Sequence, residues 1–154
     1  MKKRIGVVVL VLLLLLLAGA GAGFYYYYSK YINIDAIYPG VTIQGMSVGG
    51  MTQEEAEAKV QEYVDQVSQE TVTLQVRKKE TAFPLSDIGL KCTNMDVVEE
   101  AYNLGKTGNV FKRVMEVREL EKKGTDFPLT FSVGKEETKK VVAKKAKKFL
   151  AKKK

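Results

Sequence analysis

The chain has 154 residues and a formal net charge of +7, with a single cysteine and no histidine. This length allows one modest domain once a leader is set aside. A single cysteine excludes an intramolecular disulfide and a cysteine-based metal cage. The lack of histidine excludes Ser-His-Asp and Cys-His catalytic triads in their usual form, and histidine-based zinc sites.

The charge is unevenly distributed along the chain. Residues 1–30 carry +4, residues 31–134 carry −5 and residues 135–154 carry +8. We therefore expect three parts, in which an acidic domain lies between two basic segments. They are a cytoplasmic basic flank with a transmembrane anchor or signal peptide (1–28), an α+β domain (29–134), and a lysine-rich amphipathic helical tail (135–154).

The first part begins with three basic residues and continues as an apolar run from Ile5 to Ala18. As a signal peptide, it would be cleaved after the Ala-Gly-Ala at 18–20. As an anchor, the segment from Ile5 to Tyr28 is long enough to cross a hydrocarbon layer of ~30 Å. Aromatic side chains concentrate at the membrane–water interface and favour the anchor. The interfacial residues predicted on this ground are Tyr25, Tyr26, Tyr27 and Tyr28.

Both interpretations of the leader predict the same topology. Basic residues before the apolar run stay in the cytoplasm, so everything after Ser29 lies outside. We expect a single-pass membrane protein with its N-terminus in the cytoplasm and its domain extracytoplasmic.

The next segment, residues 38–57, predicts a strand, a turn and a capped helix. Val41 and Ile43 alternate with polar residues, which suits a half-buried strand. Three glycines then interrupt it: Gly45, Gly49 and Gly50. Thr52 followed three residues later by Glu55 is a capping-box pattern.

Helices and strands interleave irregularly through the rest of the chain. The predicted elements, in chain order, are a helix over 52–67, hairpin strands over 71–76 and 81–85, a short strand over 90–92, helices over 93–104 and 109–123, and a strand over 127–133. Thr93 or Asn94 would cap the first of the later two helices, and Gly105 would end it. The fold class expected is α+β, with an N-terminal transmembrane helix, a small, mostly antiparallel sheet and three to four helices.

Two stretches carry a family resemblance. Residues 38–45 (YPGVTIQG), followed by Gly-Met-Thr at 50–52 and Glu-Ala at 55–56, resemble the opening of a peptidoglycan-binding module. That module precedes L,D-transpeptidase (YkuD-type) or vancomycin-resistance W-type (VanW) domains in Gram-positive bacteria. Residues 101–109 (AYNLGKTGN) resemble a second family feature, a helix that ends in a glycine–basic–Ser/Thr–glycine–Asn turn. With the leader, the resemblance covers nearly the whole chain.

The resemblance implies a cell-wall module without catalysis. L,D-transpeptidases use a cysteine nucleophile activated by histidine within a Ser-His-Gly-Cys type motif, and this chain has no such motif. Cys92 lies inside the module region and is interpreted as a small buried apolar residue. We therefore expect no enzyme, no cofactor and no metal. The chain looks like the accessory module alone, either as a stand-alone protein or as a truncated relative of those enzymes.

The lysine-rich tail has two interpretations that remain open. Its apolar residues share one helical face, as in a final domain helix with a solvated surface. Its lysines also suit an anionic polymer or anionic lipid headgroups. Nucleic acid is not expected as a partner, because the compartment is wrong.

The expected function is membrane-anchored binding of peptidoglycan or another anionic wall polymer. The alternative is a protein-interaction or spacer module that positions wall-synthesis proteins. A glycine-rich turn and a helix start with free N–H groups suit the carboxylates of peptide stems. The candidate ligand contacts are Lys106, Thr107, Asn109, Lys112 and Arg113, although a turn that merely packs between helices gives the same pattern.

Overall fold

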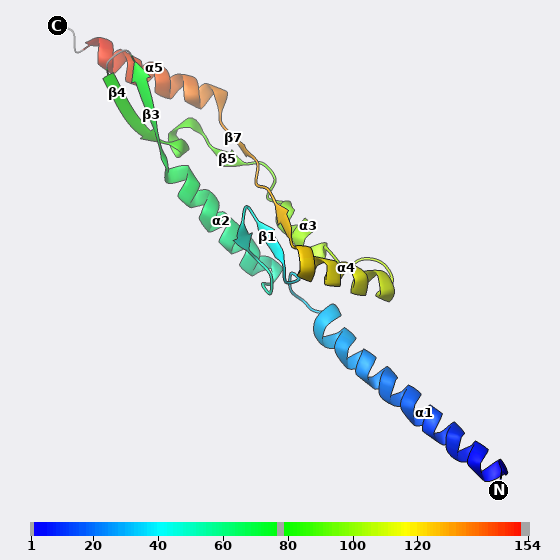
Figure 1. Ribbon diagram of the computed structural model, residues 1–154. Coiled ribbons are helices and arrows are strands. Elements are labelled where there is room, and N and C mark those ends of the chain that lie inside the picture. Colours follow the sequence, from blue (N-terminus) through cyan, green and yellow to red (C-terminus); the bar gives the residue numbers. More distant parts are fainter. Residues whose placement is uncertain (1, 77–78, 152–154) are drawn as a thin grey trace.

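The computed structural model describes residues 2–76 and 79–151, and its mixture of helices and short strands confirms the expected α+β class. The molecule is elongated, with α1 (Lys2–Tyr27) projecting from one end and α5 (Lys135–Ala151) lying at the other (Figure 1). Three of the four described strand pairs are antiparallel, and they form three small sheets rather than one.

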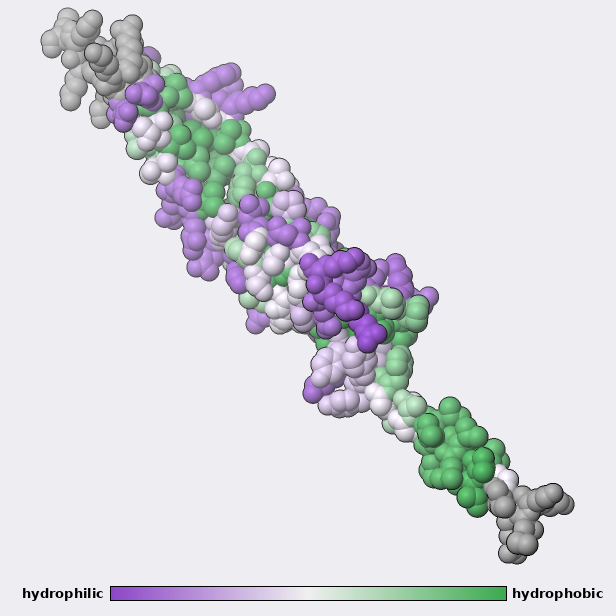
Figure 2. Space-filling model, in the orientation of Figure 1, coloured by the Kyte–Doolittle hydropathy of each residue, from purple (hydrophilic) through white to green (hydrophobic). Residues whose placement is uncertain are grey.

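After its three basic residues α1 is apolar, and most of it projects clear of the domain (Figure 2). The segment Gly6–Ile32 is long and apolar enough to cross a membrane. A π-helical turn, η1 (Tyr28–Ile32), continues it into the domain, where Ile32 is fully buried.

The half of the domain next to α1, here called the proximal half, is built around a three-stranded sheet. β1 (Val41–Ile43) pairs antiparallel with β2 (Met46–Ser47) and parallel with β6 (Thr125–Phe127). Val41 and Ile43 are buried, as their alternation predicted. The helices α3 (Val97–Asn103) and α4 (Val110–Lys123) complete this half.

α2 (Gln53–Gln69) runs from the proximal half to the distal half and begins at the predicted capping box. The Glu55 N–H donates to Thr52 Oγ1 over 3.2 Å, and the Thr52 N–H donates to Glu55 Oε2 over 2.9 Å. Ala56 and Val60 are its buried residues. The capping box and the apolar spacing together fix where the helix starts and which face it buries.

The distal half consists of short elements around the C-terminal end of α2. A hairpin joins β3 (Thr71–Val76) to β4 (Lys79–Pro84), as predicted, and a 3-10 turn follows as η2 (Leu85–Ile88). β5 (Lys91–Cys92) pairs with β7 (Phe131–Ser132), and α5 packs against η2.

The predicted strand over 127–133 is wrong in its extent, because the chain leaves one sheet and enters another. β6 ends at Phe127, and β7 begins at Phe131. Between them, the Asn94 side chain donates to Pro128 O over 2.9 Å and accepts from the Thr130 N–H over 2.7 Å. The Asn94 side chain therefore holds the segment between β6 and β7, and it does not cap α3.

The core lies in the proximal half and centres on Tyr38, whose side chain is fully buried. Its hydroxyl donates to Ile32 O, which ties the domain to the end of α1. Gly105 ends α3 in the left-handed region at φ 75°, as predicted, and a Cβ there would lie 3.1 Å from the Tyr38 ring. Glycine is needed here for both reasons.

Candidate functional site

The five predicted contact residues lie on the α3–α4 loop and the first turns of α4. Thr107 is exposed on the loop. Asn109 caps α4, with its Oδ1 accepting from the Lys112 N–H over 2.9 Å. The Lys112 ammonium lies 3.5 Å from Glu116 on the next turn. Capping and an ion pair therefore occupy two of the five residues, and their contact with a ligand stays a prediction.

Arg113 points inward to the end of α1. Its guanidinium donates to the Tyr28 hydroxyl over 2.7 Å, to Ile32 O over 2.9 Å and to Gly105 O over 3.4 Å. Planar, multidentate contacts of this kind fix orientation. Arg113 therefore joins α4 to η1, and these donors are not directed toward solvent.

Lys106 lies over the ring of Tyr102, with its ammonium 3.1 Å from the ring centroid. Among the described residues, this ammonium has no hydrogen-bond partner. Burial lowers the pKa of Lys106, and the nearby Asp35 carboxylate opposes that effect. The Tyr102 hydroxyl donates to Asp35, and this bond raises the pKa of Tyr102. The fold places Lys106 and Arg113 near each other, but both side chains mainly contact other residues of the protein rather than solvent.

The four predicted interfacial tyrosines divide into two pairs. Tyr25 and Tyr26 are exposed. Tyr27 and Tyr28 are half-buried and pack against the core. Only Tyr25 and Tyr26 therefore have rings fully available to a membrane. The interfacial role of all four tyrosines stays a prediction.

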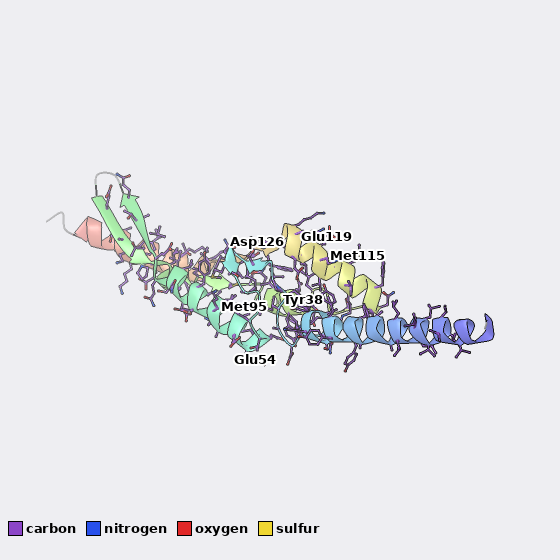
Figure 3. The ribbon with its side chains drawn as sticks, turned by 60° about the horizontal axis from the view of Figure 1, so that its bottom comes forward. Tyr38, Glu54, Met95, Met115, Glu119 and Asp126 are labelled. Carbon is purple, nitrogen blue, oxygen red and sulfur yellow. The ribbon has the colours of Figure 1, made fainter. Side chains whose placement is uncertain are left out.

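A groove that the sequence did not reveal lies between α2 and α3. We call it the α2–α3 groove; its cavity is about 590 Å³, and it is lined by Gln53, Glu54, Glu57, Ala58, Gln61, Met95, Asp96 and Glu99. Figure 3 labels Glu54 and Met95, which come from its two walls. On the sequence, the acidic residues of α2 resemble an ordinary solvated helix face. Their meeting with residues about forty positions later depends on the tertiary fold.

The groove offers carboxylate and amide oxygens, which accept hydrogen bonds from hydroxyl, amide and ammonium groups. Met95 supplies an apolar contact at its wall. Throughout residues 2–76 and 79–151, no group of three His, Cys, Asp or Glu is placed to hold a metal. Cys92 is half-buried against the core, beside Asn94.

The fold and its surfaces define a small α+β module joined to an apolar helix. Residues 81–154, slightly under half of the chain, match the sequence family described as "Putative peptidoglycan binding domain". The matched range contains the predicted 101–109 feature and α5, and it begins after the 38–57 segment. No curated protein and no solved structure matches the chain.

Proposed function

We propose that this protein is a non-catalytic cell-wall-binding module, held by α1 in the membrane with its domain on the extracytoplasmic side of a Gram-positive cell. The observation that carries the proposal is the match of residues 81–154 to a peptidoglycan-binding family. The apolar segment Gly6–Ile32, directly before the domain, supports the anchor and the compartment. The residue patterns at 38–45 and 101–109 support a relation to the modules found beside L,D-transpeptidase and VanW domains.

The α2–α3 groove is the surface best suited to the wall ligand. Its carboxylates and the amides of Gln53 and Gln61 suit the hydroxyl and acetamido groups of a glycan, or the ammonium group of a peptide stem. An open groove of this kind fits weak, repeated contacts rather than enclosure of a small molecule. Tethering by α1 raises the effective concentration of the module near the wall, so weak contacts suffice.

The test is retention of the full chain, in mild detergent, by purified insoluble sacculi. We expect retention at low salt, and Glu57→Gln together with Glu99→Gln should reduce it. The matched control is Glu62→Gln together with Glu121→Gln, which removes two carboxylates that lie outside the groove. A folded chain that stays in the supernatant would exclude wall binding.

A second candidate function is a spacer that positions wall-synthesis proteins. The elongated shape favours it, because α1 and α5 lie at opposite ends of the molecule (Figure 1). A spacer predicts no affinity for sacculi and specific crosslinks to a membrane protein. Crosslinking in intact membranes, followed by the sacculus assay, separates the two functions.

A further inference from the structure

The start of α4 packs against η1, the π-helical turn that continues α1. In Figure 1 the N-terminal end of α4 lies near the end of α1 that joins the domain, and in Figure 3 it approaches α1. Arg113, in the second turn of α4, holds this position by its bonds to Tyr28 and to Ile32 O. The first turn of α4 therefore lies close to the point where the apolar segment Gly6–Ile32 enters the domain.

This end of α4 carries exposed apolar side chains. Phe111 is 76% exposed, the highest value among the large hydrophobic side chains in the described part of the chain. Met115, one turn later, is 53% exposed and points outward from the helix (Figure 3). Because they are one turn apart, Phe111 and Met115 lie next to each other on the helix surface.

Cationic side chains continue the same face farther from α1. Phe111, Met115, Arg118 and Lys122 follow the spacing i, i+4, i+7 and i+11, which places them on one side of a helix. Of the acidic residues nearby, Glu116 pairs with Lys112 at 3.5 Å and Glu119 with Lys123 at 2.7 Å, whereas Glu121 forms no ion pair among the described residues. Among the described residues, neither Arg118 nor Lys122 forms an ion pair.

We propose that this face, which we call the α4 tip (Phe111, Met115, Arg118 and Lys122), rests on the outer leaflet of the membrane that α1 crosses. Phe111 and Met115 enter the boundary between headgroups and acyl chains, and Arg118 and Lys122 meet anionic headgroups. Continuity with α1 and the order of apolar and cationic residues select lipid as the occupant. The inference rests on the membrane anchoring of the proposed function.

A second contact with the bilayer has a mechanical consequence. One helix leaves a domain free to rotate and tilt, whereas α1 and the α4 tip together give two points of support. The Arg113–Tyr28 bond links these two points inside the domain. The elongated molecule would then stand in a defined orientation, with α5 directed away from the membrane.

The chain has no tryptophan, so Phe111→Trp introduces one indole as a probe of the tip. The full-length variant is reconstituted in vesicles of phosphatidylcholine and phosphatidylglycerol, with or without brominated acyl chains, and with iodide on both sides. Val133→Trp is the matched control, because Val133 is 48% exposed in the distal half. Met115→Trp replaces the first probe if Phe111→Trp does not fold.

We expect the indole at 111 to emit at shorter wavelength, to lose intensity with brominated lipid and to be shielded from iodide. Removing phosphatidylglycerol should weaken these effects, and the indole at 133 should show the reverse pattern. Equal iodide quenching at both positions would overturn the proposal. Shielding at 111 without bromine quenching would indicate contact with protein and would also overturn it. Because no wall is present, the result is independent of sacculus retention.

Discussion

At the scale of single residues, the domain depends on a few side chains that connect distant segments. Tyr38 and Arg113 both bond to Ile32 O, so one carbonyl at the end of η1 receives donors from two parts of the domain. The sequence shows Arg113 only as a basic residue at a helix start, which suggests an anion site. Its partner Tyr28 lies 85 residues earlier, and only the tertiary fold reveals it.

Gly40 illustrates a position where glycine is required by packing. Its φ is 88°, and a Cβ would lie 2.3 Å from Leu120 O. Gly50 has nearly the same φ of 83°, but a Cβ there would have no neighbour within 4 Å. Gly50→Ala should therefore cost only the left-handed strain, about 1 kcal/mol of unfolding free energy. Gly40→Ala should add overpacking and cost roughly 2–4 kcal/mol in total.

Urea unfolding of the two variants, followed by circular dichroism, measures this difference. Equal losses in both variants would show that Leu120 O does not constrain Gly40.

Asp126 gives a prediction about pH. The Thr42 hydroxyl donates to its Oδ1 over 2.6 Å and the Gly45 N–H over 2.8 Å, and these bonds lower the pKa of Asp126. Because the pKa of Asp126 is lower in the folded chain than in the unfolded chain, ionised Asp126 stabilises the fold at pH values above its unfolded-state pKa. This contribution is lost as the pH falls through the folded-state pKa. Asp126→Asn should thus lower the Tm at neutral pH, and the gap from the wild type should close in acid. A gap that is constant with pH would contradict the assignment.

At the scale of elements, local signals predicted the starts of α2 and α4 and the ends of α3 and α4. The predicted caps of α3, Thr93 or Asn94, are wrong, because α3 begins at Val97 without a side-chain cap. Thr52 and Glu55 are three residues apart and act on each other, so the sequence contains the whole interaction. Gly105 and Gly124 end their helices with positive φ for a similarly local reason. The predicted strand over 127–133 is too long, because Asn94, more than thirty residues earlier, holds the chain in an irregular segment between β6 and β7. The α2–α3 groove depends on contacts of the same long range.

Asn109 allows its cap and ligand roles to be separated. Asn109→Ala should destabilise the fold by about 1 kcal/mol, because the Lys112 N–H loses its acceptor. Asn109→Ser keeps a capping oxygen and should restore most of that loss. Unfolding free energies of the two variants test the cap. Sacculus retention of the serine variant then tests the ligand role, since a loss of retention in a stable protein would assign the amide to the ligand.

At the scale of the whole molecule, the proposed anchoring would place the opposite ends of the rod in different surroundings. Lys140, Lys144 and Lys147 are exposed on α5 and follow the spacing i, i+4 and i+7, so they form a cationic stripe far from α1. If α1 is in the membrane, as we propose, this stripe lies far from the lipid headgroups and can meet an anionic wall polymer. The sequence alone leaves both partners open, and the elongated shape favours the wall polymer over the lipid.

Replacement of these three lysines by glutamine should weaken binding to sacculi that retain their anionic polymers. The effect should fade as salt rises, because the Debye length falls from about 10 Å at 0.1 M to about 3 Å at 1 M. Sacculi stripped of those polymers provide the comparison, and the substitution should leave binding to them nearly unchanged. An equal loss on both preparations would place the lysines at the peptidoglycan itself.

Sacculi stripped of their anionic polymers show whether the module binds peptidoglycan itself. The measurement is the fraction of folded full-length chain that sediments with them at low salt, as sacculus concentration is raised. A module that binds peptidoglycan will show saturable retention, which Glu57→Gln with Glu99→Gln reduces and Glu62→Gln with Glu121→Gln does not. Sedimentation no greater than that of the chain alone, with the folded circular dichroism spectrum intact, would contradict peptidoglycan binding.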